Sequence, residues 1–160
     1  MKALNDQPLN LQQEIGKLKA FGFPEQEASL NLARTHALIS REFTRLFKEH
    51  GISDPQYNAL SIVAAAGRDG VFSETIGSRM VTHDPDTTRL IDQLEKVDLV
   101  QRSRSTEDRR CVRVSITPEG RRLLLRVKKK VHDLHRRQLG HLTRKQLEQL
   151  SRLLFLVRHP

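Results

Sequence analysis

Apolar residues recur every three or four positions along much of the chain, the spacing that places them on one face of an α-helix. The first long stretch covers residues 25–50 and ends before Gly51, a residue suited to stop a helix. Its apolar face consists of Leu32, Ile39, Phe43 and Leu46. Residues 11–22 predict a shorter amphipathic helix that ends at Gly22, and Pro24 begins the next element.

The middle of the chain predicts three shorter helices, each opened by a capping residue. Asp54 and Asp84 are each followed by a proline, which suits the first position of a helix. The helix that Asp54 opens is expected to end near Gly67, and Ser73 is expected to cap the second helix. In the third helix the apolar side consists of Leu90, Ile91 and Leu94. The residues expected on the outer side of that helix are Asp86, Thr88, Arg89 and Gln93.

Two short segments with alternating apolar and polar residues follow, LVQRSRS and CVRVSIT, and TEDRR joins them. They predict a β-hairpin with a charged tip. Thr117 then caps a long helix with Pro118 in its first position, and Thr143 caps a final helix. The buried stripe of the first of these helices is expected at Leu123, Val127, Val131 and Leu134. The apolar stripe that marks the final helix consists of Leu147, Leu150, Leu154 and Val157.

The order helix, turn, helix, strand, basic loop, strand is that of a winged helix-turn-helix, which puts one helix in the DNA major groove and a loop on the flanking backbone. The predicted fold is mainly α (α+β), a single domain over residues 1–160 with residues 53–117 as the DNA-binding part. The apolar stripes of residues 1–52 and 118–160 need partners, so we expect these helices to pack together and against a second copy as a dimerisation frame. A homodimer suits palindromic double-stranded DNA, with two recognition helices roughly 34 Å apart.

The net charge of +9 is unevenly distributed. Residues 1–100 carry a net charge of −3, residues 101–130 carry +8 and residues 131–160 carry +4. A basic cluster beside a helix-turn-helix is what neutralisation of DNA phosphates requires. The three consecutive lysines that end at Lys130 have two interpretations, a solvated helix face or direct phosphate contacts.

The single cysteine excludes an intramolecular disulfide, which fits a reducing cytoplasm. The longest apolar runs fall far short of the ~18–20 residues that span a bilayer, and the N-terminus MKALNDQPLN has no apolar signal core. We therefore expect a cytoplasmic protein without a membrane segment. The sequence contains no nucleophile–base arrangement, phosphate-binding loop or dinucleotide fingerprint, so neither enzymatic activity nor a cofactor is expected.

The best candidates for contacts to base edges are Thr88 and Arg89. Arginine can bond guanine O6 and N7 together, and threonine offers a hydroxyl and a methyl group to thymine. Gln93 shares their side of the helix, whereas Thr87 is expected to face inward. Asp86 has two interpretations, because it could accept from cytosine N4 or favour the helix N-terminus electrostatically.

The predicted hairpin tip carries Asp108, Arg109 and Arg110. Paired arginines suit a narrow minor groove, where the negative potential is greatest. Asp108 is expected to orient an arginine through a salt bridge. Ser73 and Thr75 are expected to reach phosphates from the start of their helix.

Three segments, DPQYNAL, TTRLIDQLEKVDLVQR and EDRRCVRVSITPEG, make the chain resemble the MarR family of bacterial transcriptional regulators. The resemblance covers about Ser53–Gly120, and the flanking helices fit the family's dimerisation layout. It implies a homodimer on a palindromic or pseudopalindromic operator. Most members repress, and an anionic or phenolic small molecule, or an oxidant, releases them from DNA. By position, Asp108 and Arg110 match the family's wing pair, and Thr88 and Arg89 match its recognition-helix positions.

Asp98 departs from the family, which usually has glycine there. Aspartate tolerates left-handed backbone better than most residues, so we expect the turn to survive. By analogy with the family, an effector pocket would lie between the first two long helices and the DNA-reading module. The polar candidates in that region are His36, Arg41 and Tyr57.

Several alternatives stand beside this interpretation. Cys111 is either a thiol activated by neighbouring arginines or a small residue at the start of a strand. His132 and His135 either share a metal ion or are solvated, and no metal site is expected. Residues 121–137 are also compatible with a membrane-surface helix, although their stripe lacks large aromatics. A ligand-independent architectural DNA-binding protein remains the principal alternative function, and it would lack an operator preference of ~10³ or more.

Arg110→Ala is expected to weaken DNA binding strongly, because a minor-groove arginine is lost from the wing. The dimer is expected to stay intact in sedimentation, since the wing lies outside the predicted frame. Near wild-type operator affinity would refute the wing role.

Overall fold

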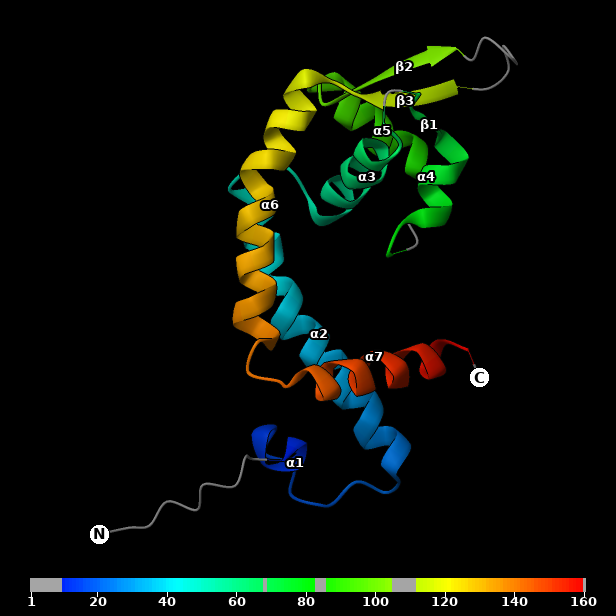
Figure 1. The fold of residues 1–160 in the computed structure, drawn as a ribbon. Helices are drawn as coiled ribbons and strands as arrows, with labels where there is room; N and C mark the ends of the chain where they lie inside the picture. The colour runs from blue at the N-terminus through cyan, green and yellow to red at the C-terminus, as the bar shows by residue number, and fades with distance from the viewer. Residues whose placement is uncertain (1–9, 68, 83–85, 105–111, 160) are drawn as a thin grey trace. The chain divides into compact units, whose positions relative to one another are not determined.

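The computed structural model describes residues 10–67, 69–82, 86–104 and 112–159. Its helices are α1 (Leu11–Glu14), α2 (Pro24–Lys48), α3 (Asp54–Ala65), α4 (Ser73–Arg79), α5 (Thr87–Lys96), α6 (Pro118–Leu139) and α7 (Arg144–Arg158). Its strands are β1 (Val71–Phe72), β2 (Val100–Arg104) and β3 (Val112–Ile116). Helices thus dominate over one small sheet, which confirms the predicted mainly α fold class (Figure 1). The chain divides into two compact units, Met1–Arg41 and Glu42–Pro160.

The first unit contains α1 and the N-terminal part of α2. Asn10 caps α1 through a reciprocal pair of hydrogen bonds with Gln13, and the helix ends after four residues. The predicted helix over residues 11–22 is therefore wrong in length, because Gly16 takes a φ of 64° and turns the chain out of the helix. Pro24 does begin the next helix, as expected. An ion pair of 2.8 Å between Arg34 and Glu14 ties α1 to α2.

The second unit is built around α3. This helix packs against α4, α5, α6 and β3, and its inner side chains are fully shielded from solvent. The largest fully buried side chains around it are Leu60, Val63, Ile76, Ile91, Leu94, Val100, Val114 and Val127. They are aliphatic, as the absence of tryptophan and the few aromatics of the sequence require.

Two predicted helix caps are wrong by one residue. α3 is capped by Ser53, whose backbone N–H donates to Gln56 Oε1 at 2.8 Å while Gln56 N–H returns a bond to Ser53 Oγ. This reciprocal arrangement leaves Asp54 inside the helix, where its carboxylate accepts from Thr44 Oγ1 at 2.8 Å. Ser73 is likewise the first residue of α4, and the N-cap position belongs to Phe72 without a side-chain bond.

The sheet has the order β1-β3-β2 and is antiparallel throughout. β2 and β3 form the predicted hairpin, in which Val100 pairs with Ile116 and Arg104 with Val112. β1 was not predicted, because two residues are too few to show an alternating pattern. Gly70 directly precedes β1 and has a φ of 69°, a conformation that favours glycine. A Cβ at this position would also lie only 2.7 Å from the Val114 carbonyl oxygen.

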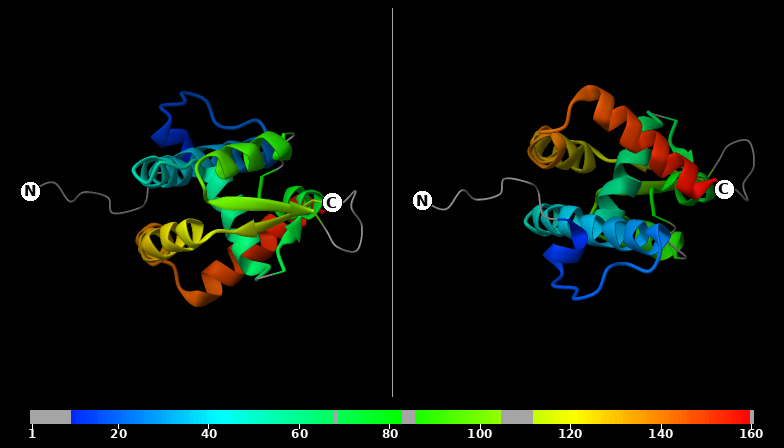
Figure 2. Two further views of the ribbon diagram at one scale, coloured as in Figure 1. Left: turned by 90° about the horizontal axis from the view of Figure 1, so that it is seen from above. Right: turned by 90° about the horizontal axis from the view of Figure 1, so that it is seen from below.

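The two C-terminal helices begin at their predicted caps, Thr117 and Thr143. α6 buries Leu123, Val127 and Leu134, whereas α7 has no buried residue. Figure 2 shows the chain turning sharply between them. Within the described part of the chain, every helix is too short or too polar to span a membrane.

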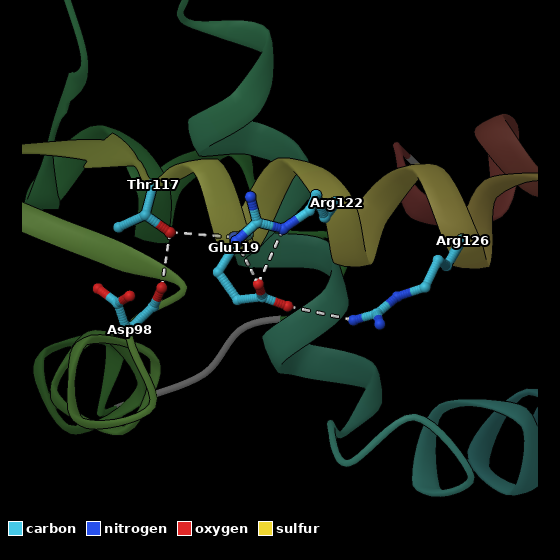
Figure 3. Close-up of polar contacts among 6 residues, drawn as sticks. Asp98, Thr117, Glu119, Arg122 and Arg126 are labelled. Carbon is cyan, nitrogen blue, oxygen red and sulfur yellow. Dashed lines mark hydrogen bonds and ion pairs between the residues drawn. The ribbon is translucent and has the colours of Figure 1, made fainter.

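The junction between the sheet and α6 depends on Thr117 (Figure 3). Its hydroxyl donates to the Asp98 carbonyl at 2.6 Å and accepts from Gly120 N–H at 3.0 Å. A Cβ at Gly120 would lie 2.2 Å from the Leu99 carbonyl, so only glycine permits this approach of α6 to the start of β2. The first turn of α6 thereby fixes the backbone at Asp98 and Leu99, which follows α5.

Glu119 lies half-buried on this first turn and contacts two arginines (Figure 3). The hydrogen bond from Arg122, and then the charge of Arg126, lower the pKa of the Glu119 carboxyl below its ordinary value. A carboxyl with a depressed folded-state pKa stabilises the fold above its unfolded pKa and loses that contribution as the pH falls through the folded value.

Asp98 adopts left-handed backbone with a φ of 56°, as expected from the glycine that the family it resembles usually has at this position. We expect Asp98→Gly to raise the free energy of unfolding by up to about 1 kcal/mol, and Asp98→Val to lower it by about 1–2 kcal/mol, because a β-branched side chain resists this conformation. Thermal unfolding measures both, with Asp98→Asn as the tolerant control. A valine variant as stable as wild type would contradict this explanation of the turn.

Candidate nucleic-acid interface

The helix α5, the predicted recognition helix, has two distinct faces. Leu90, Ile91 and Leu94 are at most 6% exposed and pack into the core. The opposite face leaves exposed Asp86 at the helix start, then Thr88, Arg89 and Gln93. The sequence prediction of these faces is confirmed, and the roles of the exposed residues in DNA contact remain predictions.

Asp86 caps α5. Its Oδ1 accepts from the Arg89 backbone N–H at 3.0 Å, and the helix begins at Thr87. The prediction that Asp84 is the N-cap is therefore wrong, because the Asp86 carboxylate accepts the hydrogen bond of the Arg89 backbone N–H. The bond supports the second interpretation of Asp86, stabilisation of the helix N-terminus.

The two helices of the helix-turn-helix meet at Gly77 of α4. A Cβ at Gly77 would lie 2.9 Å from Thr87 Oγ1, so α4 and α5 approach each other here too closely for a side chain at position 77. Thr87 is half-buried against α4, as expected of an inward-facing residue. A larger residue at position 77 would push the start of the recognition helix outward.

A surface hollow of about 340 Å³ lies between the two helices. Its lining consists of Ser73, Glu74, Gly77, Ser78, Thr87 and Thr88. Ser73 and Thr88, two of the predicted DNA contacts, are thus brought to one hollow. Thr75 is half-buried and is not part of this lining.

Arg102 of β2 connects the hairpin to α5. Its Nη1 lies 2.6 Å from Asp92 Oδ1 and 2.7 Å from Glu95 Oε2. Its Nη2 donates to the Thr88 carbonyl at 3.3 Å, and its backbone N–H donates to Glu95 Oε1 at 2.9 Å. Partial burial lowers the pKa of Arg102, but the hydrogen bonds and charges of Asp92 and Glu95 raise it above its ordinary value in sum.

The sequence carries no clear signal for this network of Arg102, Asp92 and Glu95. Asp92 and Glu95 are spaced three apart on one helix, and Arg102 is one of several arginines in a strand with alternating polarity. The spacing alone indicates an ordinary solvated face. A second polar contact from α5, between Gln93 Oε1 and Gln56 Nε2 of α3 at 3.1 Å, was also not expected.

The predicted wing contacts Asp108, Arg109 and Arg110 lie outside the described residues, and so does Cys111. The strands that flank them are described and paired. Asp84 and Pro85, the predicted opening of the recognition helix, are likewise outside.

The candidate effector residues fall in both compact units. His36 and Arg41 are exposed residues of the first unit. Tyr57 belongs to the second, where its ring stacks on Phe47 with centroids 4.4 Å apart. This stacking is an ordinary packing role, and the effector pocket stays a prediction.

The histidines on α6 have local contacts. His135 lies against Phe43, with ring centroids 4.8 Å apart, and His132 Nδ1 lies 3.9 Å from Asp133 Oδ1. Among the described residues, no three His, Cys, Asp or Glu side chains gather closely enough to hold a metal ion. On the same helix, Lys130 Nζ lies 3.1 Å from His50 Nε2.

Taken together, a capped helix with a polar outer face, a second helix packed across it and an antiparallel hairpin define a winged helix-turn-helix, a DNA-binding class of protein. Comparison with known proteins specifies the family. The MarR family model matches residues 52–112. The chain is 37% identical to a MarR transcription factor from Planctomyces limnophilus, over 86% of this chain and 99% of that one, with a TM-score of 0.65. The chain belongs to the MarR family.

Two further relatives extend this finding. The repressor IacR of Pseudomonas putida is 27% identical over 80% of this chain and 75% of its own length. MepR of Staphylococcus aureus, solved in complex with DNA, has the same fold at 19% identity, with a TM-score of 0.68 over 78% of this chain and 94% of that one. The chain is a DNA-binding transcriptional regulator by family, and the family is not one of enzymes.

Arg89→Ala is expected to reduce operator affinity by about 1–3 kcal/mol and to relax the preference at one base pair, because arginine bonds two acceptors of one guanine. Binding to a set of single-base operator variants measures both effects. Equal losses on operator and random DNA would instead identify Arg89 as a phosphate contact.

Proposed function

We propose that this regulator is a homodimeric repressor that binds a palindromic operator and is released by a small anionic or phenolic molecule. The observation that supports it best is the outer face of α5. Thr88, Arg89 and Gln93 are exposed on this face, whereas the opposite face of the helix is buried in the core. Only the outer face is available to base edges. In this proposal residues 53–117 form the DNA-binding part, and residues 1–52 and 118–160 supply the dimerisation helices.

The contacts to DNA are assigned by their place around α5. Thr88 and Arg89 read bases, and Gln93 extends that surface by one turn. Ser73 and Thr75 bind phosphates from α4, as expected for positioning contacts. The wing residues Asp108, Arg109 and Arg110 follow β2, with Arg110 in the minor groove.

The exposed apolar residues of α7 support a homodimer. They are Leu150, Leu153, Phe155, Leu156 and Val157, with exposed fractions between 38% and 64%. Leu150, Leu153, Leu156 and Val157 fall on one face of the helix at helical spacing, and such an exposed apolar face is typical of a protein interface. A second copy covers this surface and places two recognition helices for the two halves of a palindrome.

A small-molecule effector is supported by fold relatives. The organohalide-sensing regulator RdhR-CbdbA1625, whose fold matches this chain with a TM-score of 0.75 at 18% identity, was solved with 2,4-dichlorophenol bound. His36, Arg41 and Tyr57 are the residues of this chain proposed to bind such a molecule. Arginine and histidine supply positive charge or hydrogen-bond donors for an anion or a phenolate.

Selection of bound duplexes from random DNA at a fixed salt concentration tests the proposed function. The expected result is an enriched inverted repeat with half-sites one helical turn apart, bound ~10³-fold or more tightly than random DNA. Addition of a panel of phenols and aromatic acids should then release the operator. Salt-sensitive binding to every sequence, without enrichment, would indicate an architectural DNA-binding protein instead.

Leu153→Glu is expected to shift the dimer toward monomer by at least about tenfold, because a carboxylate is costly to bury in an apolar interface. Operator affinity should fall with it, since each half-site is then bound separately. Analytical ultracentrifugation measures the first effect. Ser151→Glu, which adds the same charge at an exposed polar position of α7, is the control, and equal sedimentation of both variants would contradict the proposed interface.

A further inference from the structure

Arg102 is the one described residue of the hairpin whose side chain bonds to three residues of the recognition helix. The acceptors are the Thr88 carbonyl, Asp92 Oδ1 and Glu95 Oε2, at 3.3, 2.6 and 2.7 Å. These acceptors span two turns of α5, from the candidate base-reading residue Thr88 to the second-last residue of the helix. The Arg102 side chain is 24% exposed, so it is held against the helix rather than extended into solvent.

The backbone takes part in the same network. β2 is an edge strand of the sheet, and the N–H of Arg102 points away from β3. Glu95 Oε1 accepts from this N–H at 2.9 Å while its Oε2 accepts from the guanidinium of the same residue. One carboxylate of α5 therefore binds both the main chain and the side chain of β2, which fixes the distance between helix and strand at that point.

The planar guanidinium is what this geometry requires. Arginine presents several N–H donors in a rigid fork, whereas a lysine ammonium is a single flexible point charge. Two donors of the fork, Nη1 and Nη2, serve side-chain and main-chain acceptors at once. Arg102 Nη1 alone contacts both Asp92 and Glu95, so a lysine nitrogen in its place could do the same, but it would have no second nitrogen for the Thr88 carbonyl.

We propose that Arg102 is a positioning residue for sequence readout: it holds α5 at a fixed orientation to β2, so that Thr88 and Arg89 meet the bases while the strand leads into the wing. This inference rests on the proposed function. Arg102 acts through the helix it holds, and the base contacts themselves belong to α5. Loss of the network loosens α5 relative to β2, and sequence-specific binding to the operator then weakens more than the attraction to phosphates.

The test separates position from charge. Arg102→Met combined with Glu95→Gln removes one positive and one negative charge, so the net charge stays the same. The matched control is Arg144→Met with Glu148→Gln, which removes an exposed ion pair of 2.8 Å on α7. Each protein is titrated with the selected operator and with a random duplex of equal length over a range of salt concentrations.

The double variant is expected to lose about tenfold or more in operator affinity and to keep its affinity for random DNA within about threefold, with the same salt slope. The control variant should bind both duplexes as wild type does. A ratio of operator to random affinity that is unchanged, or equal losses on both duplexes, would overturn the proposal. A wild-type protein without operator preference would instead refute the proposed function.

A second variant keeps the inference testable if the double variant folds poorly. Arg102→Lys retains the charge and is expected to lower the affinity ratio by about threefold to tenfold. Amide hydrogen exchange of this variant without DNA should be faster in α5 and β2 by about tenfold, and unchanged in α3 and α6. Unchanged exchange in α5 would show that the network does not hold the helix, whatever the result with DNA.

Discussion

The structure of the second unit depends on the burial of one face of α5. Leu90, Ile91 and Leu94 lie in the core with Leu60 and Val63 of α3. Successive residues of an α-helix are rotated by about 100°, so a slip of one position would expose an isoleucine or leucine and bury Arg89 or Gln93. Hydrophobic packing therefore decides which side chains α5 exposes, and these are the ones that can contact DNA in the proposed function.

The packing of α5 is reinforced at both ends by contacts that tolerate little change. At its start, Asp86 caps the helix and Thr87 meets Gly77 of α4. At its end, Asp98 turns left-handed and its carbonyl accepts from Thr117, which opens α6. The recognition helix is thus held between the preceding helix and the long helix that leads to α7.

The sheet is too small to hold the hairpin by itself. β1 contributes two residues, and only β2 and β3 pair over five. The hairpin is instead attached through Val100 and Val114, which are buried in the core, and through the contacts of Arg102 with α5. Arg102 thus joins the helix and the strand that contact one continuous stretch of DNA in the proposed function.

Most of the helices could be predicted from the sequence, because their signals are local. Apolar periodicity identified the buried face of α5, and threonine followed by proline identified the start of α6 at Thr117. Asp98 could be placed in a left-handed turn by its resemblance to a glycine position. These features depend on residues within a few positions of one another.

The features that escaped prediction depend on tertiary contacts or on competing local choices. β1 forms only because β3 lies beside it, and Arg102 gains its role only when β2 is placed against α5. Ser53 and Asp54 are both good capping residues, and the reciprocal bond with Gln56 decided between them. The effector residues could not be tested by local pattern at all, since a pocket is made by residues far apart in the chain.

The most direct test of this account is the map of backbone amide signals that shift when isotope-labelled protein binds the selected operator. The account predicts the largest shifts at Thr88, Arg89 and Gln93, with small shifts at Leu90, Ile91 and Leu94, whose side chains stay in the core. Shifts concentrated on α6 or α7, with α5 unchanged, would contradict the claim that core packing of α5 creates the DNA-reading surface.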